Sequence, residues 1–325
     1  MSFATRRVAA AAVLCFVCHA VQAEWVIDTQ PIMGTRVHVE VWHEDTAAGR
    51  AAVAAVMAEM RRIDELMSPF RETSELSALN REAARQPVKV SPDLLAVLQH
   101  ARAMSELTGG AFDVTFASAG RYYDYRKRIR PDDATLARAV EAIDYRYVEI
   151  DAARHTVSYR HPGVYVDLGG IAKGYAVDLG IALLEARGID QAMVGAGGDS
   201  RIIGDRRGEP WTVGVKDPRE PDSIAVVLPL ENTAVSTSGD YQRYFEQDGV
   251  RYHHIIDPST GDSARAVRSV TILGPDATRT DGLSTSVFVL GAEKGLALID
   301  RLPEFDAIVI DGEGKLFYSK GLENL

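Results

Sequence analysis

Asp167-Leu-Gly-Gly-Ile-Ala-Lys-Gly-Tyr-Ala-Val-Asp178 places three glycines and a lysine in front of a run of apolar residues with helical spacing. Val164 and Val166 alternate with polar residues before it, so we expect a strand to end here and a helix to cover residues 171–187. Unpaired backbone N–H groups at a helix start attract anions, and Lys173 adds a full positive charge. The stretch therefore predicts either a phosphate site or an ordinary Gly-rich turn with a surface lysine.

Common nucleotide and nucleophile motifs do not account for this stretch. It matches neither Gly-x-x-x-x-Gly-Lys-Ser/Thr nor Gly-x-Gly-x-x-Gly. Residues 195–199 (Gly-Ala-Gly-Gly-Asp) come closer to the second pattern, but a strand rather than a helix is expected after them. Residues 236–240 (Ser-Thr-Ser-Gly-Asp) form no Gly-x-Ser-x-Gly elbow. A Rossmann site and covalent serine catalysis are both disfavoured.

The chain of 325 residues is acidic, with a formal net charge of −10, and 46% of it is hydrophobic. That length and composition suit one large core or two lobes. Because we see no basic stripe to replace the counterions around phosphates, we expect no nucleic-acid partner.

The N-terminal residues have the pattern of a secretory signal peptide. Arg6 and Arg7 precede an apolar run at 8–17, and Val21-Gln22-Ala23 offers a cleavage site, so we assign residues 1–23 to the signal. A membrane anchor needs roughly 20 apolar residues, about twice this run. We expect a periplasmic protein without disulfides, since both cysteines lie in this segment.

Residues 24–325 read as a single domain, with room for two lobes, of mixed α/β (α+β) class. Helices are expected at 47–67, 92–107, 133–143, 280–290 and 293–301. Strands are expected at 36–42, 147–150, 156–159, 192–194, 200–203, 211–215, 224–228, 234–236 and 270–273, and in hairpins at 241–254 and 307–318. No regular strand-helix-strand alternation is present, so we predict largely antiparallel sheets with flanking helices.

Two further segments carry candidate chemistry. Asp281 and Thr285 are four residues apart at the start of a helix, which puts both oxygens on one face, as ligands for Mg²⁺ or as helix-capping and core residues. His253 and His254 are adjacent in a strand and therefore point to opposite faces. His254 is either an acid or base or a structural histidine, and Asp257, before a proline, is first a turn former.

Taken together and in order, these stretches resemble the ApbE-type family, the FAD:protein FMN transferases. The resemblance covers nearly the whole chain after the signal. The matching segments are 33–35, 67–70, 74–77 with Asn80, 108–113, 167–178, 197–199, 236–240, 254–261 and 281–285. Gly282, where the family more often has Ala, and the loop at 195–200 depart from the family pattern.

The resemblance implies an ApbE-like flavin transferase fold and a Mg²⁺-dependent enzyme. It would transfer FMN from FAD to a threonine hydroxyl of an acceptor flavoprotein, through a phosphoester bond, and release AMP. Asp281, Thr285 and the carbonyl of Gly170 would hold Mg²⁺, and Lys173 would stabilise the phosphates. The proton would go to His254 or Asp257. The residues that would line the FAD pocket are Met33, Phe70, Ala111, Phe112, Asp113, Asp167 and Ile256.

Two alternatives stay open at this point. The same residues would serve a Mg²⁺-dependent FAD pyrophosphatase, in which water replaces threonine. A non-catalytic flavin-binding protein would use Asp281 and Thr285 only to cap a helix. The resemblance implies exported acceptors, such as subunits of ion-pumping NADH:quinone reductases or related electron-transfer complexes, and through them an association with the inner membrane.

Overall fold

The computed structural model describes residues 24–220 and 223–322; the predicted signal peptide lies outside them. The strands are β1 (Glu24–Ile32), β2 (Thr35–His43), β3 (Val88–Lys89), β4 (Val148–Asp151), β5 (Thr156–Tyr159), β6 (Ala192–Ala196), β7 (Asp199–Ile203), β8 (Trp211–Lys216), β9 (Ile224–Leu230), β10 (Ala234–Gly239), β11 (Tyr244–Gln247), β12 (Val250–His253), β13 (Val267–Gly274), β14 (Asp306–Asp311) and β15 (Leu316–Tyr318). The helices are α1 (Thr46–Met67), α2 (Glu75–Glu82), α3 (Pro92–Leu107), α4 (Ala117–Gly120), α5 (Asp133–Val140), α6 (Ala172–Glu185) and α7 (Ala277–Ile299), with 3-10 turns at Val114–Phe116 and Tyr145–Tyr147.

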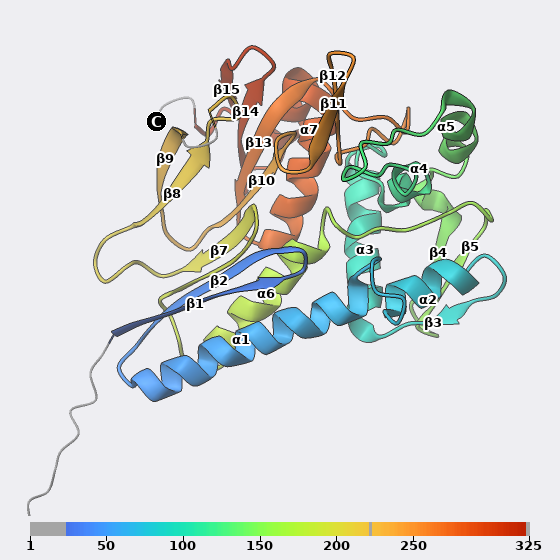
Figure 1. The fold of residues 1–325 in the computed structure, drawn as a ribbon. Helices are drawn as coiled ribbons and strands as arrows, with labels where there is room; N and C mark the ends of the chain where they lie inside the picture. Colours follow the sequence, from blue (N-terminus) through green and yellow to red (C-terminus); the bar gives the residue numbers. More distant parts are fainter. Residues whose placement is uncertain (1–23, 221–222, 323–325) are drawn as a thin grey trace, which may run out of the picture.

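The main sheet has eight strands in the order β1-β2-β6-β7-β10-β13-β14-β15, and every neighbouring pair is antiparallel. Three long helices pack on it in the same order: α1 against β1 and β2, α6 against β6 and β7, and α7 against β10 and β13 (Figure 1). The expected mixed α/β class with antiparallel sheets is confirmed. Since α6 packs against α7, their first turns meet beside the sheet.

A second region joins α2, α3, α4 and α5 to the three-stranded sheet β3-β5-β4, on the right of Figure 1. Buried apolar side chains run without interruption from Val26 in β1 to Val309 in β14, through α2 and α3 as well as the main sheet. One core therefore supports both regions.

Several local expectations can be compared with the structure. The hairpin β11-β12 turns at Asp248-Gly249, both with positive φ (52° and 76°), as Asp-Gly predicts. The break expected between two C-terminal helices is a kink inside α7, where Gly291 has φ 78°. Both β1 and α2 were missed, although Ser74 caps α2 and Leu76 and Leu79 are buried at helical spacing.

Candidate functional site

The Gly-rich stretch is entered from an extended segment, and the strand expected at 164–167 is wrong. Residues 164–168 join no sheet. The Asn80 side chain takes the place of a neighbouring strand: its Nδ2 donates to the carbonyl of Val166 (2.8 Å), and its Oδ1 accepts from the Val166 N–H (2.8 Å). Asp167 N–H donates to the Val114 carbonyl (3.0 Å). The Asn80 side chain thus provides the hydrogen bonds that a neighbouring strand would give to the backbone of Val166. The Gly-rich turn begins three residues later, at Gly169.

Helix α6 starts directly after the turn, at Ala172, and no side chain caps it. Asp167 braces the turn by accepting the N–H of Gly169 with Oδ1 (2.7 Å). Burial raises the pKa of Asp167. The N–H groups of Ile171 and Ala172 donate to the Leu168 carbonyl, and that of Gly174 donates to Asp281. Lys173 therefore supplies most of the positive charge at this helix start.

The ammonium of Lys173, in that first turn, lies between two buried carboxylates. Its Nζ is 2.9 Å from Asp199 Oδ2 and 3.3 Å from Asp281 Oδ2, and it donates to the Gly169 carbonyl at 2.9 Å. The side chains of Asp199 and Asp281 are each 3% exposed, whereas that of Lys173 is 24% exposed. The cluster sets one cation against two carboxyl groups and has a net negative charge when both carboxyls are ionised.

Asp281 does not cap its helix. The N-cap of α7 is Asp276, whose side chain accepts from Arg279 N–H, and Asp281 lies a turn further on, facing α6. Its Oδ2 accepts the N–H of Gly174 (3.1 Å). A Cβ on Gly174 would lie 2.1 Å from the Ala277 carbonyl oxygen, so only glycine permits this approach of α6 to α7.

Burial controls the ionisation of this cluster. Burial, and then the neighbouring charge of Asp199, raise the pKa of Asp281 to about 7. Burial disfavours the charge of Lys173, but Asp199 and Asp281 outweigh it and raise the pKa of Lys173 above its usual range. Lys173 is therefore charged at neutral pH, while Asp281 is poised to ionise when a cation arrives.

Oxygen donors next to Asp281 fit a hard cation. Gly170 lies against Thr285, since a Cβ on Gly170 would be 3.2 Å from Thr285 Oγ1. Ser238 Oγ, from β10, is 3.4 Å from the same hydroxyl. Among the described residues no group of three or more His, Cys, Asp or Glu could hold a metal. A site built from one carboxylate, one hydroxyl and one carbonyl suits Mg²⁺, which commonly keeps water and phosphate as its other ligands.

The residues predicted to line an FAD pocket differ in their surroundings. Phe112 is buried, and its ring lies 3.3 Å from the Cβ position of Gly170. Asp113 is buried too, but its carboxylate is used locally: Oδ1 accepts from Thr115 and Oδ2 from Tyr145 N–H (2.7 Å). Burial raises the pKa of Asp113.

The other predicted FAD residues lie on different segments and differ in exposure. Phe70, between α1 and α2, is 81% exposed and offers a free aromatic face. Met33 has φ 54° in the β1-β2 turn, next to Gly34. Ala111 is half-buried beside Phe112, whereas Ile256 is buried in a small apolar cluster with Tyr123.

The two adjacent histidines differ in their surroundings. His253 is buried, and its Nε2 lies 2.6 Å from the Ala264 carbonyl. His254 is half-buried, and its Nδ1 is buried without a hydrogen-bond partner among the described residues. Burial, and then the positive charge of Arg243, lower the pKa of His254 to about 3. His254 is therefore neutral at physiological pH, and the same low pKa makes it a weak base in these surroundings.

The Asp257 side chain stabilises the turn in which it lies. Its Oδ1 accepts from the Ser259 N–H (2.9 Å) and the Ser259 hydroxyl (2.7 Å), and its own N–H donates to Asp262 O. This matches the turn-forming role expected of an Asp-Pro pair, and it engages Asp257 Oδ1 within its own turn.

The geometry can now be set beside known proteins. The ApbE family model matches residues 33–309. The chain belongs to the ApbE family. It is 36% identical to the FAD:protein FMN transferase of Treponema pallidum, over 90% of this chain and 86% of that protein. It is 35% identical to the FAD:protein FMN transferase of Vibrio cholerae, over 86% and 85%.

Solved structures of this family share the fold. The ApbE protein of Thermotoga maritima superposes with a TM-score of 0.85 at 35% identity, covering 93% of this chain and 99% of that one. The flavin transferase ApbE of Vibrio cholerae gives 0.83 at 32% identity, over 93% and 99%. The expected ApbE-like flavin transferase fold is confirmed.

One departure from the ApbE pattern has a local explanation. A Cβ on Gly282 would lie 3.0 Å from Met104 Cε and 3.1 Å from its Cγ. The Met104 side chain from α3 therefore fills the space that an alanine methyl at position 282 would use. The neighbouring Asp281 keeps its place against α6.

Asp199 is the member of the cluster that sequence reasoning missed as a site residue. It ends the matching segment 197–199, and no local spacing connects it to Lys173. Pairing of β7 with β6 and β10 brings it under α6. Asp199 could have been identified because it is an acidic residue next to two glycines, and because a partly buried Lys173 needs an acidic counterion.

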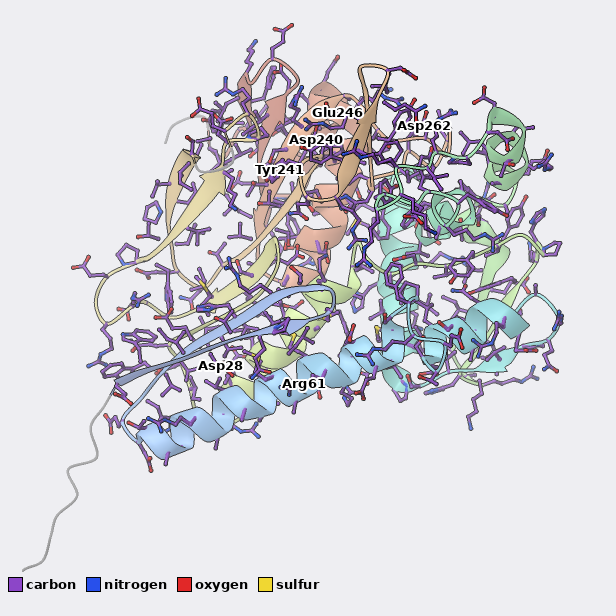
Figure 2. The ribbon with its side chains drawn as sticks, viewed as in Figure 1. Asp28, Arg61, Asp240, Tyr241, Glu246 and Asp262 are labelled. Carbon is purple, nitrogen blue, oxygen red and sulfur yellow. The ribbon has the colours of Figure 1, made fainter. Side chains whose placement is uncertain are left out.

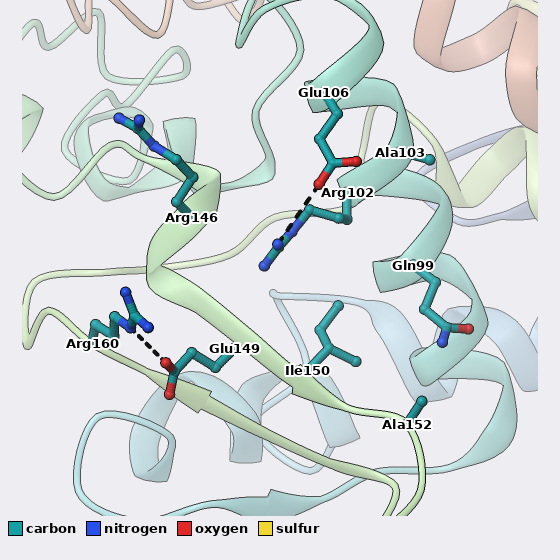
Figure 3. Close-up of a pocket in the computed structure, with 9 residues that line it drawn as sticks. All are labelled: Gln99, Arg102, Ala103, Glu106, Arg146, Glu149, Ile150, Ala152 and Arg160. Atoms are coloured by element: carbon teal, nitrogen blue, oxygen red, sulfur yellow. Dashed lines mark hydrogen bonds and ion pairs between the residues drawn. The ribbon is translucent and has the colours of Figure 1, made fainter.

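Another charged region lies apart from this site. An open groove of about 690 Å³ runs between α3 and β4, lined by Arg102, Arg146 and Arg160 among others (Figure 3). Each arginine has an acidic partner: Glu106 at 3.8 Å, Asp144 at 2.6 Å and Glu149 at 2.5 Å, respectively. The groove therefore offers little free positive charge to an anion.

Proposed function

We propose that this enzyme transfers FMN from FAD to a threonine hydroxyl of an acceptor flavoprotein, with Mg²⁺, through a phosphoester bond, and releases AMP. The observation that carries the proposal is the cluster of Lys173, Asp199 and Asp281 at the start of α6. Two carboxyl groups against one ammonium would suit a divalent cation, and the Lys173 ammonium would suit the diphosphate of FAD.

Different residues of the chain would bind the metal and stabilise the phosphates. Asp281, Thr285 and the Gly170 carbonyl would hold Mg²⁺, which when bound neutralises phosphate charge. Lys173, with the first turn of α6, would stabilise the charge that develops on the departing AMP phosphate. Asp199 would remain as the counterion of Lys173 once Asp281 turns to the metal.

The proton balance assigns a role to His254. The threonine oxygen forms a bond to the FMN phosphorus, and the bond from that phosphorus to the bridging oxygen breaks, so that AMP leaves with the electron pair. The hydroxyl proton would pass to the imidazole of His254. Its pKa, lowered to about 3 by burial and Arg243 while no FAD is bound, would have to rise for this role, and the negative charge of the FAD diphosphate would raise it.

The test is to incubate the enzyme with FAD, Mg²⁺ and a candidate acceptor domain, and to measure in-gel flavin fluorescence and AMP. Covalent fluorescence on the acceptor with an equal amount of AMP is expected. An acceptor in which the target threonine is replaced by valine is the matched control. AMP with free FMN would identify a pyrophosphatase instead, and bound FAD without AMP would identify a binding protein.

We propose export to the periplasm, as the pattern at residues 1–23 suggests. Acceptors would then be exported flavoprotein domains, such as those of ion-pumping NADH:quinone reductases, held at the inner membrane. Fractionation of cells, with a cytoplasmic and a periplasmic marker, tests the location.

A further inference from the structure

The connection from α4 to α5 is a strongly basic segment in an acidic protein. Residues 121–130 read Arg-Tyr-Tyr-Asp-Tyr-Arg-Lys-Arg-Ile-Arg, with a single carboxylate, whereas the whole chain has a net charge of −10. This basic loop is a local exception to the expectation that no basic stripe is present. It is too short to neutralise the phosphates along a nucleic acid, which takes about 6–10 contacts for strong binding.

The loop is ordered by its own backbone. Asp124 and Ile129 pair across it, with N–H to carbonyl distances of 3.0 Å and 2.9 Å in the two directions. Asp124 Oδ1 also accepts the N–H groups of Arg126 (3.1 Å) and Lys127 (2.9 Å). Arg128 has φ 57° at the tip. This turn presents residues 126–128 outward, and all three are exposed.

Two cations at the tip of the loop, like Arg121 at its base, have no carboxylate partner in the described part of the chain. Lys127 pairs with Asp124 (3.2 Å), and Arg130 pairs with Asp133 (2.8 Å). In the described part of the chain, the guanidinium groups of Arg126 and Arg128 have no carboxylate within ion-pair distance. They differ in this from the arginines of the groove in Figure 3, which all have acidic partners.

The base of the loop is attached to the segment that carries His254. Tyr125 Oη donates to the His253 carbonyl (3.2 Å), and Tyr123 Oη donates to Asp262 Oδ1 (3.0 Å). In Figure 2, Asp262 lies beside the β11-β12 hairpin, on the side of α4 and α5. On the other flank, the Arg121 guanidinium lies 5.1 Å from the ring centre of Tyr165, two residues before Asp167. The loop therefore borders the candidate site.

Apolar side chains accompany the free cations. Tyr122 is 43% exposed and Ile129 is 47% exposed. An exposed aromatic and an exposed aliphatic side chain among arginines are typical of the surfaces by which proteins bind each other. A lipid surface is a poorer match, since anionic lipids would repel the acidic remainder of the chain and attract only three free cations.

We propose that the basic loop 121–130 docks the acceptor protein, by binding an acidic surface next to its target threonine. The inference rests on the proposed transfer to a protein, because only a macromolecular acceptor would touch this loop while its hydroxyl reaches His254. Opposite charges would raise the rate of encounter and orient the acceptor, an effect that salt weakens.

The test compares two doubly substituted enzymes with the same change of charge. Arg126→Gln with Arg128→Asn removes the two free cations at the tip of the loop, and asparagine tolerates the positive φ at 128. Arg85→Gln with Arg154→Asn removes two exposed arginines elsewhere. At low salt the first variant should raise KM for the acceptor protein about tenfold, and the second should leave it unchanged. The kcat and the affinity for FAD should be those of the wild type in both.

The salt dependence of KM tests whether the effect of the loop is electrostatic. In about 0.5 M salt the difference in KM should disappear, because the Debye length falls below about 5 Å. An unchanged KM at low salt in the first variant would overturn the proposal. So would an equal loss of FAD affinity, which would make the loop an FAD contact, or loss of sedimentation with phosphatidylglycerol vesicles at constant KM, which would make it a membrane contact. If the wild type itself transfers no FMN, the proposed function fails first, and this inference fails with it.

Discussion

The site at the start of α6 and the groove between α3 and β4 both gather charged side chains, and they differ chiefly in burial. In the site, Lys173 lies between two carboxylates that are 3% exposed. In the groove, Arg160 and Glu149 are closer together (2.5 Å) but are 65% and 47% exposed. Water screens the groove pair, whereas the site charges act on each other at low dielectric.

The difference teaches that the number of charges does not mark a site in this chain. The groove contains three arginines, but none of its acidic side chains combines strong burial with a second anion as neighbour. In the site, burial and Asp199 together raise the pKa of Asp281 to about 7. A pKa shifted by burial and by a neighbouring charge is typical of residues in functional sites. Four predictions test the contrast, in order of decreasing effect.

Asp281→Asn should give the largest effect. The amide keeps the shape of the side chain but removes the negative charge that would hold Mg²⁺, so turnover should fall about 10³-fold. The measurement is kcat as a function of Mg²⁺ concentration. Asp276→Asn, at the N-cap of the same helix, is the matched control and should keep its activity. An Asp281→Asn enzyme with unchanged Mg²⁺ dependence would exclude this metal site.

Lys173→Met should lower turnover about 10²-fold, by removing one charge that faces the phosphates. It also leaves two buried carboxylates without a cation, which costs about 3–5 kcal/mol of unfolding free energy. Lys173→Met with Asp199→Asn removes that excess charge and should recover most of the stability, measured by urea denaturation, but not the activity. Recovery of both would show that Lys173 acts only on the fold.

The pH dependence of Mg²⁺ binding should follow Asp281. Its pKa of about 7 means that the carboxyl is protonated below neutral pH and must lose that proton to bind the metal. The apparent affinity for Mg²⁺ should therefore fall by up to about tenfold for each pH unit below 7 and level off above it. Thermal stabilisation by Mg²⁺ and FAD between about pH 5.5 and about pH 8 measures this. A constant affinity over that range would contradict the raised pKa.

The sequence predicted the antiparallel class of the fold because its signals are local. Asp-Gly at 248–249 determined the turn of β11-β12, and Gly291 determined the break in α7. The strand expected at 164–167 was wrong for a physical reason. Alternating residues can be held extended by one side chain, here Asn80 at 86 residues' distance, without any sheet.

The site was predictable only where residues share one element. Asp281 and Thr285 are four apart on α7, and spacing alone brought them together. Their alternative reading as helix caps is excluded by Asp276. The contact of Lys173 with Asp199 depends on how β7 and β10 lie under α6, which no local pattern encodes. The position of the basic loop 121–130 could not be predicted from the sequence either, since its contact with His253 forms only in the tertiary structure.

Arg160→Ala should have the smallest effect, and it tests the other half of the contrast. The change removes an exposed ion pair with Glu149, so the free energy of unfolding should change by less than about 1 kcal/mol. Transfer activity should equal that of the wild type at low and at high salt, because the screened charge is already balanced. A loss of activity comparable to that of Lys173→Met would place the groove in the functional site. Burial would then no longer distinguish the two regions.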